Sequence, residues 1–112
     1  MEIGDVYAVE IPASDGHQQA GARPAIIAQA PQFGDRLPTV LIVPLTSRLT
    51  AASFPGTFRI QPDSDNSLNA ISVALVFQLR AIDKRRVKRR LGRLSASDLS
   101  QIQDQIKALL RV

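Results

Sequence analysis

The chain has 112 residues, of which 45% are hydrophobic and 21% charged, a composition typical of one globular domain rather than of a disordered segment. It contains no cysteine and a single histidine, His17, which excludes disulfides and thiolate catalysis and argues against a zinc or iron site. We therefore expect no metal and no other cofactor. The sequence also lacks a run of roughly 18 apolar residues and a signal-peptide pattern at its start, so we expect a cytoplasmic protein without membrane contact.

Short β-branched apolar clusters, separated by turn residues, predict five strands and a sixth, highly basic one. The run at 39–45 is almost continuously apolar, as expected for a strand buried on both faces. A second long apolar run extends from 71 to 79 and is also predicted as one strand. The predicted strands cover residues 6–11, 24–29, 39–45, 57–61, 71–79 and 87–91.

Two connections are longer than an ordinary hairpin loop. The first runs over residues 12–22 and is rich in glycine, serine and other turn formers, and the second runs over 47–56. Hairpin loops usually have two to five residues, and longer loops often carry function. Both segments are therefore candidates for functional loops.

The chain changes character at Ser95, where an amphipathic helix is predicted. Ser95 followed by Asp98 resembles a capping box with aspartate in place of the preferred glutamate. The next apolar residues fall on one helical stripe, which should pack on the strands. The fold class we expect is mainly β with a C-terminal helix, built as one domain over residues 1–112 around a small, strongly curved sheet or partly open barrel. The stripe consists of Leu99, Ile102, Ile106, Leu109 and Leu110.

Positive charge is concentrated between Arg80 and Arg93. This segment contains eight basic residues and one acid, Asp83, whereas the rest of the chain has six bases and nine acids. Such a local field suits a phosphate backbone and would also attract an acidic protein segment. Because side chains alternate along a strand, the eight cations cannot all line one groove, and some should face solvent.

Standard nucleophile and nucleotide motifs are absent. The chain has no G-x-S-x-G elbow, no cysteine–histidine pair and no G-x-x-x-x-G-K-[ST] loop. The chemistry that remains must use arginine, hydroxyls, amides and one histidine. RNA cleavage fits this set, because the neighbouring 2′-hydroxyl is the nucleophile and the enzyme has only to align it and stabilise charge on the phosphate.

Four segments, in order along nearly the whole chain, resemble the MazF/PemK toxin family. GDVY at 4–7 and GHQQAGARPA at 16–25 resemble its G-D-[IV] strand and G-x-E-Q-x-G-x-R-P loop. VPLTS at 43–47 is similar to its V-P-[LI]-T-[ST] strand end, and QLRAIDK at 78–84 to its Q-[IVL]-R-[TS]-I-D-K segment. The C-terminal helix also falls where the family has one.

The resemblance implies an SH3-like β-barrel of the CcdB/PemK type and a homodimer that belongs to a type II toxin–antitoxin system. It further implies sequence-selective cleavage of single-stranded RNA such as mRNA, leaving 2′,3′-cyclic phosphate and 5′-hydroxyl ends. An antitoxin with an acidic disordered segment would neutralise the toxin. Carried over by position, the catalytic residues are Arg23 and Thr46. A guanidinium can bind phosphate oxygens at any working pH, and a threonine at a strand end can donate its hydroxyl.

One position departs from the family pattern, because Gln18 stands where the loop usually has glutamate. Glutamine cannot exchange a proton, so we hypothesise that His17 supports proton transfer together with this position. The alternative is a solvated loop histidine without a role.

The remaining candidates bind RNA rather than react with it. Ser47 and Arg80 are predicted to contact RNA, as is Gln19, although Gln19 could instead shape its loop. Gln78 is either an RNA contact or a buried amide that satisfies the backbone. Among the aromatic residues, only two fall in predicted loops where they could stack on an unpaired base, whereas three fall in predicted strands and are assigned to the core. The first group is Phe33 and Phe54, and the second is Tyr7, Phe58 and Phe77.

Two other functions stay open at this point. The related CcdB toxins have the same barrel and poison DNA gyrase without cutting, but they act through a C-terminal tryptophan, glycine and isoleucine. This chain ends in Leu110-Arg111-Val112 and has no tryptophan. The other alternative is an inactive homologue that binds only nucleic acid or antitoxin, which the glutamine at position 18 would favour.

Overall fold

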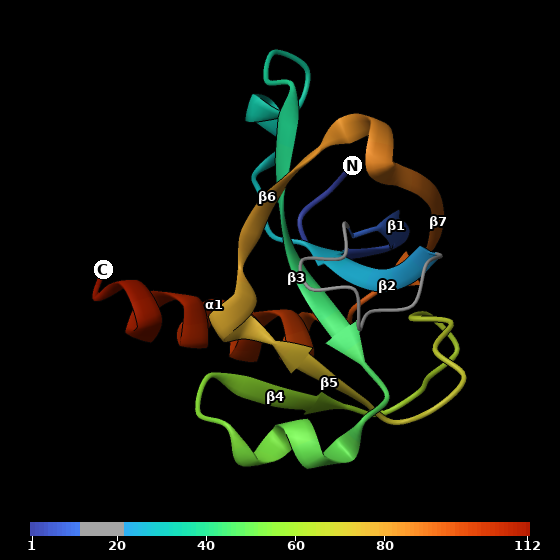
Figure 1. The fold of residues 1–112 in the computed structure, drawn as a ribbon, viewed down its shortest axis with the longest axis vertical. Helices are drawn as coiled ribbons and strands as arrows, with labels where there is room; N and C mark the ends of the chain where they lie inside the picture. Colours follow the sequence, from blue (N-terminus) through green and yellow to red (C-terminus); the bar gives the residue numbers. More distant parts are fainter. Residues whose placement is uncertain (12–21) are drawn as a thin grey trace.

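The computed structural model describes residues 1–11 and 22–112 of the chain. In this part, strands form one sheet and a single α-helix ends the chain (Figure 1). Short 3-10 helices connect several strands: η1 (Pro31–Phe33), η2 (Leu49–Ser53), η3 (Val76–Gln78) and η4 (Lys84–Arg86). The strands are β1 (Asp5–Glu10), β2 (Ala22–Ile27), β3 (Thr39–Thr46), β4 (Thr57–Ile60), β5 (Ser72–Leu75), β6 (Arg80–Asp83) and β7 (Val87–Arg93), and the helix is α1 (Ala96–Leu110).

The strand β3 pairs with three other strands, β2, β5 and β6. The strand order is β4-β5-β3-β2-β1-β7, every pairing is antiparallel, and β6 pairs with the first half of β3. One edge of β3 therefore contacts β2, while its other edge contacts first β6 and then β5. Figure 1 shows β3 running through the middle of the molecule, with β1, β2 and β7 on one side of it. The sheet is curved but not closed, so the predicted mainly β fold with a C-terminal helix is confirmed in its partly open form.

Side chains on the two faces of the sheet form two apolar clusters. The first includes Val6, Ile26 and Val43 and packs against Ile102 of α1. The second includes Val9, together with the residues that alternate with the first set along β2 and β3. This is the result expected when successive side chains of a strand point to opposite faces and both faces are covered. The second cluster consists of Val9, Ala25, Ile27, Val40, Ile42 and Ile82.

The helix α1 begins as predicted, because the Ser95 hydroxyl accepts a hydrogen bond from the Asp98 N–H at 3.1 Å. The prediction that the whole stripe packs on the strands is wrong. Leu109 and Leu110 are 46% and 54% exposed, because the last turns of α1 extend past the edge of the sheet (Figure 1). Within the described residues, no helix is long and apolar enough to cross a membrane.

The predicted strand at 71–79 is also wrong in its second half. The strand β5 ends at Leu75 and the chain turns through η3, after which the unpredicted β6 pairs with β3. The run contains no glycine or proline to mark such a turn, so it was indistinguishable from one long strand. The turn is what allows β5 and β6 to pair with different halves of the same edge of β3.

Candidate functional site

The two predicted catalytic residues lie on the neighbouring strands β2 and β3, Arg23 near the start of β2 and Thr46 at the end of β3. Ala25 pairs with Pro44 and Ile27 with Ile42. The pairing ends at Ala25–Pro44; if the same register continued for two more positions, Arg23 would fall opposite Thr46. Because side chains alternate along a strand, both residues belong to the face that carries Ile27 and Ile42.

The backbone around Thr46 is held by the sheet on one side and by the following loop on the other. Thr46 pairs with Val73 of β5 and is half-buried. Its hydroxyl oxygen accepts a hydrogen bond from the Arg48 N–H at 3.2 Å. This bond uses a lone pair of the oxygen and not its hydrogen, so the hydroxyl can still donate to a bound oxygen.

Arg23 lies near the start of β2, where this strand still pairs with β1. It is the ladder partner of Val9 and is half-buried. Residues 22 to 24 also border a groove of about 590 Å³, and two further cations stand on its rim. The polar residues of this groove are Arg23, Ser67, Asn69, Arg89 and Arg90. A guanidinium beside a cationic groove is a suitable environment for a polyanion.

A rigid turn forms the far side of that groove. The fully buried Asn66 accepts hydrogen bonds from the Asp63 and Leu68 N–H groups at 3.1 and 3.0 Å. Its amide nitrogen donates to the Gln61 carbonyl at 2.9 Å. The next residue, Ser67, has a positive φ of 57°, which L-residues rarely adopt unless the surrounding structure holds them. The turn therefore presents Ser67 to the groove in a fixed position.

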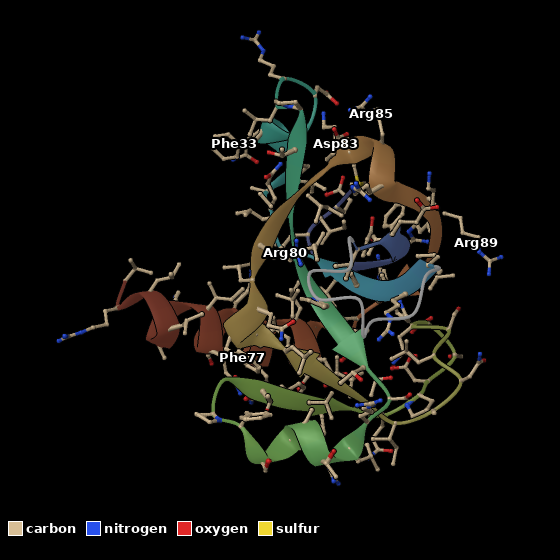
Figure 2. The ribbon with its side chains drawn as sticks, viewed as in Figure 1. Phe33, Phe77, Arg80, Asp83, Arg85 and Arg89 are labelled. Atoms are coloured by element: carbon tan, nitrogen blue, oxygen red, sulfur yellow. The ribbon has the colours of Figure 1, made fainter. Side chains whose placement is uncertain are left out.

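Three of the predicted RNA contacts lie in the described part of the chain, and all three are exposed. Arg80 pairs with Ile42 and so shares the face assigned to Arg23 and Thr46; Figure 2 shows it on β6, where that strand runs beside β3. Gln78 lines a pocket together with Thr46, so the alternative of a buried amide is wrong. Ser47 directly follows β3 and is exposed.

Acidic residues pair with some cations of the basic segment. Arg85 donates to the carboxylate of Asp83 at 2.8 Å, as Figure 2 shows. The side-chain hydrogen bond from Arg85 lowers the pKa of Asp83 to about 2. Lys88 lies 3.7 Å from Glu10. By contrast, Arg89 extends outward from β7 (Figure 2) beside the cationic groove.

A third cation of the segment, Arg90, both pairs with an acid and lines the cationic groove. Its guanidinium lies 3.3 Å from the buried carboxylate of Asp5, and it also borders the groove that Arg23 enters. A partly neutralised arginine attracts a phosphate less strongly than a free one. We therefore expect Arg89 to contribute more to a polyanion than Arg90.

Three further candidates belong to the long first loop. His17, Gln18 and Gln19 fall in residues 12–21, outside the described residues. Their predicted roles stay predictions.

One exposed aromatic residue near Thr46 was assigned to the core by the sequence, and that assignment is wrong. Phe77 is 39% exposed because it belongs to η3 rather than to a strand. Its ring centroid lies 5.8 Å from that of Phe54, and both rings line the pocket that contains Thr46. No local signal marked this exposure, because the run at 71–79 contains no glycine or proline at the turn.

These features define the class of protein: a small curved β-sheet with a C-terminal helix, an arginine and a threonine on neighbouring strands, and cations along one groove. The family model of the PemK-like, MazF-like toxins of type II toxin–antitoxin systems matches residues 2–110. The chain therefore belongs to the PemK/MazF toxin family.

Individual relatives agree with this placement. The chain is 33% identical to the endoribonuclease MazF of Staphylococcus saprophyticus over 106 residues, which cover 95% of this chain and 88% of the relative. Its fold is similar to the crystal structure of MazF from Deinococcus radiodurans, with a TM-score of 0.79, 23% identity and coverage of 100% and 97% of the two chains. A mycobacterial endoribonuclease in complex with its cognate antitoxin is similar too, with a TM-score of 0.78, 20% identity and coverage of 100% and 96%.

Proposed function

We propose that this protein is a metal-independent toxin that cuts single-stranded RNA, with Arg23 and Thr46 as its catalytic residues. The observation that carries the proposal is the β2–β3 register, which, continued two positions past its last pair Ala25–Pro44, would bring Arg23 opposite Thr46 on one face of the sheet. Residues facing each other on antiparallel strands have Cα atoms about 5 Å apart, so two such side chains can contact the same phosphate group. The family of the chain and its relative named as an endoribonuclease support the same activity.

The proposed reaction needs no bound cofactor. The 2′-oxygen of the RNA attacks the adjacent phosphorus and loses its proton, while the bond from phosphorus to the 5′-oxygen breaks and that oxygen gains a proton. The products are a 2′,3′-cyclic phosphate and a 5′-hydroxyl. The Arg23 guanidinium would neutralise charge that develops on the non-bridging oxygens, and the Thr46 hydroxyl would donate to one of them.

Further contacts would guide the strand through the site. Arg80 lies on the same face as Thr46 but four residues away along β3, counted from its partner Ile42. At about 3.4 Å per residue this corresponds to about 14 Å. Arg80 would therefore bind a phosphate other than the scissile one. Ser47 and Gln78 flank Thr46 and would contact the nucleotides next to the cut, in a sequence-selective manner.

The second partner we propose is an antitoxin, and we also propose that the toxin is a homodimer. A structural relative is a complex of an endoribonuclease with its cognate antitoxin. In this chain, Arg86, Arg89 and Arg93 are exposed, so an acidic segment that is disordered before binding would find a complementary surface here.

The first prediction concerns the metal requirement. Purified protein should cleave a single-stranded RNA equally fast in EDTA and in magnesium, because the proposed charge stabilisation comes from Arg23 and Thr46. Gel analysis of an end-labelled RNA measures the cleavage rate. Resistance of the product's 3′ end to phosphatase identifies the cyclic phosphate. Activity that appears only with added magnesium would overturn the mechanism. RNA binding without cleavage would instead favour the inactive homologue.

A further inference from the structure

Two exposed aromatic side chains lie side by side next to Thr46. Phe54 is 59% exposed and Phe77 is 39% exposed, and their ring planes are tilted by 54° at a centroid distance of 5.8 Å. Adjacent exposed aromatic rings offer an apolar surface on which a ligand or partner can pack. The pair comes from two separate connections of the chain, one before β4 and one after β5.

The rings form one wall of a pocket that Thr46 borders. The pocket has a volume of about 450 Å³, which lies within the range of small-ligand sites, about 300–1,000 Å³. Hydroxyl, amide and guanidinium groups complete its lining, so it combines an apolar surface with hydrogen-bonding groups. The polar lining residues are Thr46, Arg48, Thr50, Ser53 and Gln78.

Hydrogen bonds fix the backbone of both phenylalanines, and thus the positions from which the rings extend. The Phe77 N–H donates to the Gly56 carbonyl at 3.1 Å, and the Thr57 hydroxyl donates to the Phe54 carbonyl at 2.8 Å. Gly56 has a positive φ of 73°, and a Cβ at this position would lie 3.2 Å from the Cβ of Phe77. Glycine therefore allows the loop to approach η3 closely. A preorganised pair loses little conformational entropy when a planar ligand stacks on it.

An unpaired base of a single-stranded nucleic acid matches this combination of aromatic rings and polar groups. Unpaired bases are planar, stack on aromatic rings, and carry donors and acceptors on their edges. The cations and the predicted catalytic hydroxyl near the pocket suit the phosphates on either side of such a base. An apolar peptide side chain would use the rings but would leave the surrounding polar groups without partners.

We propose that Phe54 and Phe77 form a subsite for one unpaired nucleobase of the RNA, next to the phosphate that contacts Thr46. The proposal rests on the function proposed above and adds to it the position at which the protein holds a base. Gln78, on the same pocket, would bind an edge of this base.

The test compares Phe54→Leu and Phe77→Leu with the control Phe33→Leu. Phe33 is 54% exposed, but Figure 2 shows it at the other end of the molecule from Phe77. Leucine keeps an apolar side chain, and thermal melting checks that each variant is folded. The ligand is a fluorescent RNA with a 2′-deoxy nucleotide at the mapped cleavage position, which the proposed reaction cannot cut. We expect the Kd measured by anisotropy to rise about 10-fold in each pocket variant and not in the control.

Abasic nucleotides, introduced one position at a time, identify the base. One abasic position should weaken binding to the wild-type protein about 10-fold but should add little to the loss in Phe54→Leu, because the same contact is already missing. Variants that bind every RNA as the wild type does would overturn the subsite while leaving the cleavage proposal intact. A wild-type protein that neither binds nor cuts RNA would instead overturn the proposed function itself.

Discussion

Arg23→Ala should lower the rate of RNA cleavage about 10²–10³-fold, because one charged donor to the transition state is lost. The folded protein should be unaffected, since Arg23 is a half-buried residue near the start of β2 rather than a member of either apolar cluster. Single-turnover cleavage at saturating protein measures the chemical step directly. Arg23→Lys keeps the charge but loses the planar fork of donors, so it should restore only part of the rate.

The matched control is Arg36→Ala. Arg36 is exposed and precedes β3, whereas Thr46 ends that strand, so the length of β3 separates Arg36 from the proposed site. Its removal should leave the rate within about twofold of the wild type, as expected for a surface charge outside the site. Equal losses in the two arginine variants would mean that Arg23 contributes only to the general electrostatic attraction of RNA.

Thr46 requires its own pair of substitutions. Thr46→Ser retains the hydroxyl and should keep most of the activity, while Thr46→Val keeps the β-branched shape and should lose about 10²-fold or more. The contrast separates a donated hydrogen bond from packing at the strand end. If the valine variant cuts RNA as the serine variant does, the hydroxyl has no part in the reaction.

Gly92→Ala should strongly destabilise the fold. A Cβ at this position would clash with the Asp65 carbonyl oxygen and would lie 2.9 Å from the Asn66 carbonyl carbon. Both are backbone atoms of the turn that the buried Asn66 holds in place, so they cannot swing aside as a side chain could. We expect a loss of about 3 kcal/mol or more in the free energy of unfolding.

Urea unfolding at one fixed protein concentration measures this effect, with Gly34→Ala as the control. Gly34 has an ordinary helical φ of −65°, and a Cβ there would meet only the Pro31 carbonyl at 3.2 Å. Its stability should change by about 1 kcal/mol or less. A Gly92→Ala protein that unfolds at the wild-type midpoint would show that the turn does not pack against β7 as described.

The sequence was sufficient for the parts of the fold that local patterns dictate. Alternating apolar residues predicted β1 and β2 to within one or two residues, and Ser95 marked the start of α1. These features depend on the period of the side chains and on a cap, both of which act over a few residues. They can therefore be predicted without knowledge of the tertiary structure.

Features that depend on long-range pairing were harder to predict. Nothing local distinguishes β5 from η3 in an apolar run, because the turn is imposed by the need to pair with two halves of β3. The exposure of Phe77 follows from that turn and was missed with it. Leu109 was assigned to the packed stripe because periodicity cannot tell where the supporting sheet ends.

In the candidate site too, residue identities could be predicted locally, whereas their arrangement depends on long-range pairing. Arg23, Thr46 and Arg80 were selected from motifs, but the register that places them on one face comes only from the paired strands. The pocket beside Thr46 combines residues from two connections of the chain, one between β3 and β4 and one between β5 and β6. A local sequence pattern does not show that residues from separate parts of the chain line one pocket.

The central claim is that the RNA supplies its own nucleophile while Arg23 and Thr46 stabilise the reacting phosphate. Its most direct test is an RNA of the preferred sequence in which only the nucleotide on the 5′ side of the cut lacks its 2′-hydroxyl, incubated with the protein in EDTA. We expect this RNA to stay intact at the modified position, while the unmodified RNA is cut there to a cyclic phosphate. Cleavage of the 2′-deoxy RNA at the same bond and rate would show that water or another group attacks the phosphate, and would contradict the mechanism.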